Sequence, residues 1–137
     1  MSSSESIFDL LHKAVDHGEN FGASFVEARY DDLTLSTLNL TNDIVTQAST
    51  SQRKGIGIFA YFEGTPGYSF TPNLKVDEIK YATERAVKIA RSTASMNEMK
   101  FNFESMQTIK DRKVLDVKIH PKDTDITEKI EIRFTDY

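Results

Sequence analysis

The chain has 137 residues, enough for one domain with a core of its own, and a formal net charge of −4. The negative charge argues against a protein that neutralises phosphates, so direct binding of nucleic acid is disfavoured. The absence of cysteine excludes disulfides, thiolate nucleophiles and Cys-ligated zinc, and it fits a reducing compartment, so we expect a cytoplasmic location.

The first predicted element is an amphipathic helix beginning at Ile7. A capping box of Ser2 and Glu5 is expected before it, and Gly18 is the expected stop. Charged residues interrupt the apolar ones and no basic flank precedes them, so the segment fits neither a signal peptide nor a membrane span. The apolar stripe consists of Ile7, Leu10, Leu11, Ala14 and Val15.

Three β-capable runs follow, over residues 24–31, 33–41 and 44–53. Residues 31–32 and 42–43 are of the types that form turns between strands. Within the second run the leucines change parity, which predicts a bulge or a bend midway. The third run is polar, which indicates a solvent-facing or edge strand.

Two glycines, Gly55 and Gly57, follow a basic pair and allow either a phosphate-binding loop or a strand. A phosphate loop needs a helix directly after its glycines, whereas residues 56–62 form an apolar strand pattern typical of a central strand. Residues 63–67 then close a hairpin and residues 68–70 return. We therefore favour structural roles, with Gly57 making space for a covering helix. The glycines assigned such roles are Gly55, Gly57, Gly64 and Gly67.

A second amphipathic helix is predicted over about residues 76–95, with acidic residues at its start and basic ones at its end. Residues 115–119 alternate as a strand, and residues 126–134 fit either a helix or a strand. Together the elements predict an α+β fold, a mainly antiparallel twisted sheet of about five strands with two amphipathic helices packed on it. We expect a domain over residues 1–96 and a connector with one strand over 97–137.

Residue chemistry alone indicates no catalytic, cofactor or metal site. His12, His17 and His120 lack the spacing of a zinc-binding helix, and no nucleophilic serine motif is present. The carboxylates have plainer roles in turns and helix ends. A group of aromatics indicates core packing, with a stacking platform for single-stranded nucleic acid as the alternative. These are Phe59, Tyr61, Phe62, Tyr68 and Phe70.

The order of elements between Gly22 and Ala94 resembles the N-terminal region of the TldD/PmbA family. The resemblance rests on Gly22-Ala23 with Glu27, Gly55 with Gly57, Gly64 with Gly67, and Ala86 with Ala90-Arg91. It implies a zinc-metalloprotease family, also labelled modulators of DNA gyrase, whose proteolytic members process small peptides and antitoxin proteins. One departure is Phe59, where the family often has Arg, so any role of that arginine does not transfer.

The resemblance also implies where the chemistry lies. The family's metal is held by a His-Glu-x-x-x-His helix further downstream, and this sequence has no such motif. Zinc is therefore expected only in a C-terminal part of a metal-bearing parent, with none in this chain, which should be inactive alone. The family forms paired subunits, so a homodimer or a heterodimer with a paralogue is expected, with a peptide or unfolded protein as substrate and no membrane partner.

We interpret the chain as a non-catalytic domain that contributes to a subunit interface and to the wall of a substrate chamber. An extended peptide could add to an exposed strand edge, for which the polar run Ile44 to Gln52 is the candidate. The alternative is a stand-alone regulatory module that binds a gyrase or toxin–antitoxin protein without proteolysis. The candidate edge residues are Ile44, Thr46, Gln47, Ser49 and Ser51.

Overall fold

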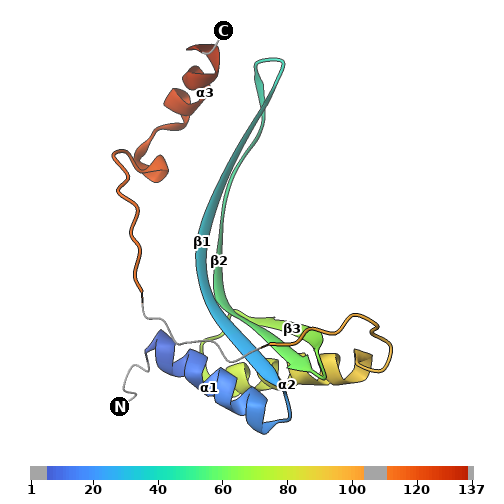
Figure 1. The fold of residues 1–137 in the computed structure, drawn as a ribbon. Helices are drawn as coiled ribbons and strands as arrows, with labels where there is room; N and C mark the ends of the chain where they lie inside the picture. The colour runs from blue at the N-terminus through green and yellow to red at the C-terminus, as the bar shows by residue number, and fades with distance from the viewer. Residues whose placement is uncertain (1–5, 104–110, 136–137) are drawn as a thin grey trace. The chain divides into compact units, whose positions relative to one another are not determined.

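The computed structural model describes residues 6–103 and 111–135, and the chain divides into two compact units, residues 1–104 and 105–137. The chain contains α-helices together with an antiparallel sheet, so the predicted α+β class is confirmed (Figure 1). The first unit contains α1 (Ile7–Asn20), β1 (Phe25–Thr41), β2 (Ile44–Phe62), β3 (Thr65–Thr71) and α2 (Val76–Thr93). The second contains a short 3-10 helix, η1 (Pro121–Asp123), and α3 (Ile126–Thr135).

The sheet has three strands in the order β1-β2-β3, so the expectation of about five strands is wrong. Residues 31–32 form no turn, because they lie inside β1 opposite residues 54–55 of β2. The Asp32 carboxylate there accepts a hydrogen bond from the Gln52 side chain at 3.1 Å. Pairing across a long hairpin thus overrides the turn preference of the two aspartates, and the four short runs join into two long strands.

The hairpin between β1 and β2 turns where the sequence predicts. Asn42 and Asp43 both have positive φ, 50° and 63°, as a two-residue hairpin loop requires. The predicted bulge lies next to this turn rather than midway along the strand. Asn39 is opposite Gln47 but Leu40 is opposite Val45, so Thr46 is the extra residue.

The strand predicted in residues 97–137 is absent from the described residues of that range. Leu115 and Ile119 are exposed, since no described strand of the second unit offers their segment a hydrogen-bonding partner. Of the two alternatives at the end of the chain, the helix is the one observed, as α3.

Helices α1 and α2 cover one face of the sheet at the end where all three strands meet (Figure 1). We call this helix-covered part the base. Helix α1 begins with a capping box of Ser6 and Asp9, in place of the expected Ser2 and Glu5, which lie outside the described residues. The fully or nearly fully buried core side chains include Ala14, Ile56, Ile58, Ala60, Ile79, Ala86 and Val87.

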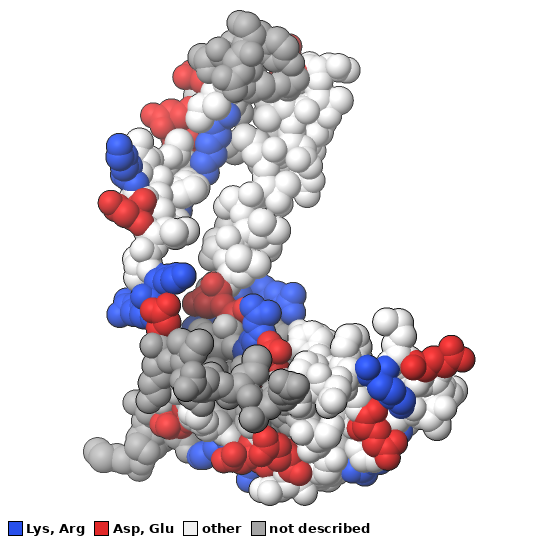
Figure 2. All heavy atoms as spheres, in the orientation of Figure 1, with Lys and Arg blue, Asp and Glu red and all other residues white. Residues whose placement is uncertain are grey.

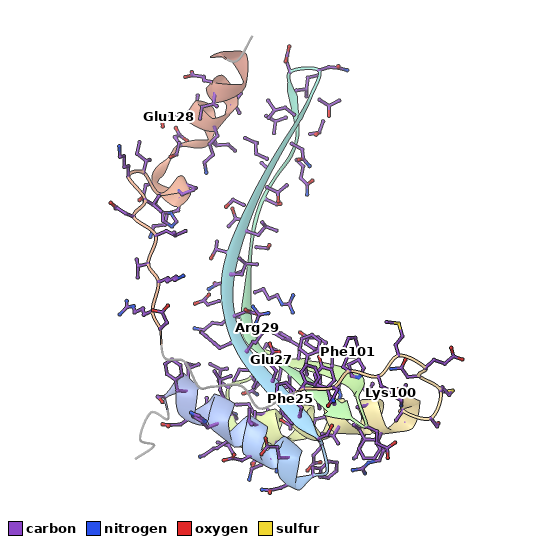
Figure 3. The ribbon with its side chains drawn as sticks, in the orientation of Figure 1. Phe25, Glu27, Arg29, Lys100, Phe101 and Glu128 are labelled. Carbon is purple, nitrogen blue, oxygen red and sulfur yellow. The ribbon has the colours of Figure 1, made fainter. Side chains whose placement is uncertain are left out.

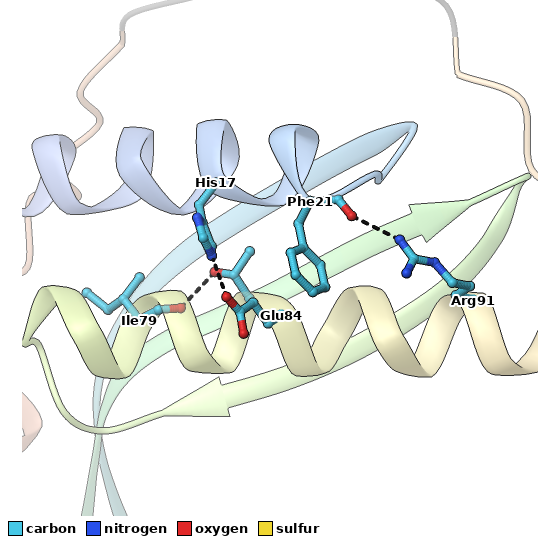
Figure 4. Close-up of polar contacts among 6 residues, drawn as sticks. His17, Phe21, Ile79, Glu84 and Arg91 are labelled. Carbon is cyan, nitrogen blue, oxygen red and sulfur yellow. Dashed lines mark hydrogen bonds and ion pairs between the residues drawn. The ribbon is translucent and has the colours of Figure 1, made fainter.

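Polar contacts join the two helices to each other beside this core (Figure 4). His17 of α1 lies 3.0 Å from the Glu84 carboxylate of α2, and Arg91 of α2 donates to the Phe21 carbonyl at 2.9 Å. Inside α2, the buried Thr83 hydroxyl donates to the Ile79 carbonyl at 2.7 Å. The first two contacts hold α1 and α2 together beside the core.

The close approach of a helix to a strand occurs at Gly67, so the assignment of that role to Gly57 is wrong. A Cβ on Gly67 would meet the Ala86 carbonyl oxygen and lie 2.6 Å from the Ala90 nitrogen, both in α2. A Cβ on Gly57 would instead meet the Tyr68 ring, 3.0 Å from its hydroxyl. The added Cβ of Gly57 would therefore lie on the face of the sheet that lacks helices. Gly64, with φ of 76°, forms the β2–β3 turn together with Glu63.

Candidate functional site

The feature that distinguishes this sheet is a long free edge on β2. β3 pairs only with residues 56–62, whereas β1 pairs along the whole of β2. Residues 44–55 of β2 therefore have a partner strand on one side and, among the described strands, none on the other. We call the two-stranded ribbon of residues 31–54 the arm; it extends beyond the helices (Figure 1).

All five predicted edge residues lie on this part of β2, and all are exposed. Gln47, Ser49 and Ser51 alternate along one face, opposite Asn39, Thr37 and Leu35 of β1. Their placement along one strand is what the sequence suggested. That the edge lacks a second partner strand depends on where β3 ends, which the polar composition alone does not give.

The outer part of the arm, residues 33–52, is almost free of charge. Between Leu33 and Gln52 the only charged residue is Asp43, at the turn. Figure 2 shows the two-stranded ribbon as largely white, with few blue or red side chains. Cross-strand pairs hold it together: the Ser36 and Thr50 hydroxyls lie 3.2 Å apart, and the Asn39 amide donates to the Gln47 side-chain oxygen at 2.8 Å. Such an edge offers backbone hydrogen bonds with little selection by charge.

The free edge has a defined end beside the base. A Cβ on Gly55 would meet the Thr71 carbonyl oxygen and lie 2.6 Å from the Phe70 ring, so β3 closes tightly against β2 here. Just outside this point, the Arg53 guanidinium lies 4.6 Å from the centre of the Phe70 ring and 3.4 Å from the Tyr68 hydroxyl. The sequence shows Arg53 only as half of a basic pair, because its aromatic neighbours come from another strand.

The sheet face without helices is aromatic at the base. Phe103 stacks on Phe25 with ring centres 4.5 Å apart and meets the edge of Tyr61 at the same distance. The Phe101 backbone N–H donates to the Gly64 carbonyl at 2.8 Å, and Figure 3 shows Phe25 and Phe101 on this side.

A shallow hollow of about 390 Å³ lies between the segment of residues 100–103 and the Glu63–Gly64 turn. Lys100 anchors the segment by donating to the Ala94 carbonyl and, at 3.1 Å, to the Thr65 hydroxyl. Of the predicted aromatic group, Phe59, Tyr61 and Tyr68 pack among themselves or with these added rings on this face. Phe62 instead lies 5.3 Å from the Arg91 guanidinium of α2.

No group of three or more His, Asp or Glu side chains that could hold a metal occurs in residues 6–103 and 111–135. The residues described do not fit a zinc site. His17 is engaged with Glu84, and the His120 ring accepts from the Lys122 backbone at 3.2 Å. No helix among the described residues is long and apolar enough to cross a membrane.

Comparison with known proteins agrees with this architecture. Residues 26–90 match the family model described as PmbA/TldA metallopeptidase domain 1. The fold is similar to that in the crystal structure of TldE from Thermococcus kodakarensis, with a TM-score of 0.53 and 19% identity over 88% of this chain and 27% of that chain. The chain thus spans about a quarter of the length of that protein. No curated protein matches.

These matches define a peptidase-related domain of the α+β class. Residues 26–90 thus match the first domain of the TldD/PmbA family, which confirms the resemblance. The matching model is described as a metallopeptidase domain, whereas the described part of this chain offers no group of ligands for a metal.

Proposed function

We propose that this domain binds extended polypeptide at the free edge of β2, as the non-catalytic N-terminal part of a TldD/PmbA-like peptidase. The observation that carries the proposal is the mismatch in strand length: β2 runs from Ile44 to Phe62, but β3 covers only residues 56–62. A peptide strand placed on residues 44–55 would continue the line of β3 and complete a three-stranded arm.

The physics of strand addition suits a peptide-processing protein. Main-chain hydrogen bonds supply affinity, while pockets for alternate side chains supply specificity. The outer part of the arm offers backbone hydrogen bonds and few side-chain pockets, since apart from Asp43 the side chains of residues 33–52 are small, polar or aliphatic. Binding would therefore depend weakly on the sequence of the peptide, as required of a domain that presents many unfolded chains to a separate hydrolytic site.

Hydrogen–deuterium exchange on the 137-residue chain tests the proposal. A ten-residue acetylated and amidated peptide of Thr, Ser, Gln and Val should slow amide exchange in residues 44–55 and leave α2 unchanged. A scrambled peptide should do the same, whereas a peptide N-methylated at every residue should not, because it has lost the N–H donors on both of its edges. Unchanged exchange at 44–55 with saturating peptide would contradict the proposal.

A second role, as part of a subunit interface, is supported by apolar side chains on the arm. Leu33 and Leu35 lie on one face with 55% of each exposed, and Ile44 beside the turn is 67% exposed. Exposed aliphatic side chains in a row are typical of contact surfaces. We propose that they contact a second subunit, either a copy of this chain or a paralogue.

Analytical ultracentrifugation of the 137-residue chain, alone and mixed with its paralogue, tests this second role. The double substitution Leu33→Thr and Leu35→Thr should weaken self-association or association with the paralogue, while Arg85→Gln on α2 should not. A monomer at all concentrations, alone and with the paralogue, would contradict it.

A further inference from the structure

We infer that Arg53 forms a carboxylate-binding subsite at the base end of the β2 edge and gives peptide binding there a preference for an acidic residue. The inference rests on the proposed strand addition and adds the one position at which the edge is selective.

The position of Arg53 follows from strand geometry. Arg53 is three residues beyond Ile56, the last residue of β2 that pairs with β3, so it flanks the first stretch of edge that a peptide could occupy. Side chains directly opposite one another on neighbouring strands have Cβ atoms about 4.5–5.5 Å apart. A peptide side chain opposite Arg53, on the same face, would therefore lie within reach of the guanidinium.

The direction of the Arg53 side chain supports the same conclusion. Its guanidinium lies against the Phe70 ring and Tyr68 hydroxyl, both of β3. The side chain therefore leans toward the side of β2 on which the peptide would bind, and away from β1. Stacking on an aromatic ring limits the motion of the planar group, so less entropy is lost when it binds a carboxylate.

The neighbouring charges make Arg53 the selective group. Lys54 lies on the other face, directly opposite Asp32 of β1. Arg53 lies directly opposite Leu33, and Asp31, on the β1 side of the same face, is opposite Gly55. The guanidinium has five N–H donors, one of which reaches Tyr68. A carboxylate from an added strand would find the remaining donors on its own side of β2.

Fluorescence anisotropy with dye-labelled peptides and the 137-residue chain tests the inference. The neutral ten-residue peptide is compared with versions carrying Glu, Gln or Lys at either end, all acetylated and amidated, and with a Gln version that has a free carboxyl terminus. We expect the Glu peptide to bind about two- to fivefold more tightly than the Gln peptide, as for an exposed ion pair, and the difference to shrink with added salt.

Variants assign the preference to the residue. Arg53→Gln should remove the Glu preference while leaving binding of the neutral peptide, and Arg53→Lys should retain part of it. Arg85→Gln is the matched control, because Arg85 also lies near an aromatic ring, 5.8 Å from the centre of Tyr81, but on α2. It should keep the full preference. Tighter binding of the free-carboxyl peptide alone would assign the subsite to a chain terminus instead of a side chain.

The outcomes separate this inference from the proposed function. Equal affinity for Glu and Gln peptides, together with protection of residues 44–55, would overturn the subsite and leave strand addition intact. A Glu preference that survives Arg53→Gln would also overturn it. Failure of every peptide to bind would overturn both.

Discussion

The base and the arm are built from the same two strands and differ in what covers them. In the base, two helices cover one face, and Ile56 and Ile58 have no exposed surface. In the arm, β1 and β2 stay paired but every residue from 44 to 54 is exposed. A two-stranded ribbon alone is marginally stable in water. The comparison teaches that the base supplies the stability, while the arm presents backbone to a partner.

The largest expected effect comes from removing core volume in the base. Ile58→Ala should lower the free energy of unfolding by about 2–5 kcal/mol, because a buried isoleucine leaves a cavity when truncated. Leu35→Ala in the arm is the control and should change it by less than about 0.5 kcal/mol, as for an exposed side chain. Urea unfolding followed by circular dichroism measures both. Equal losses would show that the arm contributes to the core.

A smaller effect is expected where strand and helix touch. Gly67→Ala should cost about 1–3 kcal/mol, since its Cβ would meet the backbone of α2 at Ala86 and Ala90. Gly57→Ala faces the exposed Tyr68 ring, which can move aside, and should change stability by less than about 0.5 kcal/mol. The same urea titrations compare the two. A larger loss at Gly57 would mean that the uncovered face is as tightly packed as the helix layer.

The sequence predicts the base better than the arm because burial leaves a periodic signal. The apolar spacing of α2 predicts its ends to within two residues, and the apolar run 56–62 correctly predicts a central strand. The apolar residues of α2 are not all buried, since Ile89 is exposed whereas Val87 has no exposed surface. In the arm no face is buried, so the sequence of the arm has no apolar periodicity that marks a continuous strand. The aspartates at 31–32 therefore predict a turn, and the two long strands are predicted as several short ones.

The candidate site shows the same limit. Its polar strand was recognisable from composition, but the free edge depends on β3 stopping at Thr71. Arg53 gains its neighbours only through the pairing of β2 with β3, so no local pattern could indicate Tyr68 and Phe70 as its partners. The rings of Phe101 and Phe103 on the sheet lay in a segment expected to be a connector.

The smallest effects compare the two hairpin turns, one in each region. Both have two residues with positive φ, Asn42-Asp43 in the arm and Glu63-Gly64 in the base. Glu63→Asn creates an Asn-Gly pair, the preferred sequence for such a turn, and should raise the free energy of global unfolding by about 0.5 kcal/mol.

The matching change in the arm should act only locally. Asn42→Ala places a less suitable residue at φ of 50° and should speed amide exchange in residues 36–50 severalfold, with no change in the urea midpoint. The reason is that the arm can open without exposing the buried side chains of the base. A lowered midpoint for Asn42→Ala would show that arm and base unfold as one cooperative unit, and the division between a stabilising base and a presenting arm would then fail.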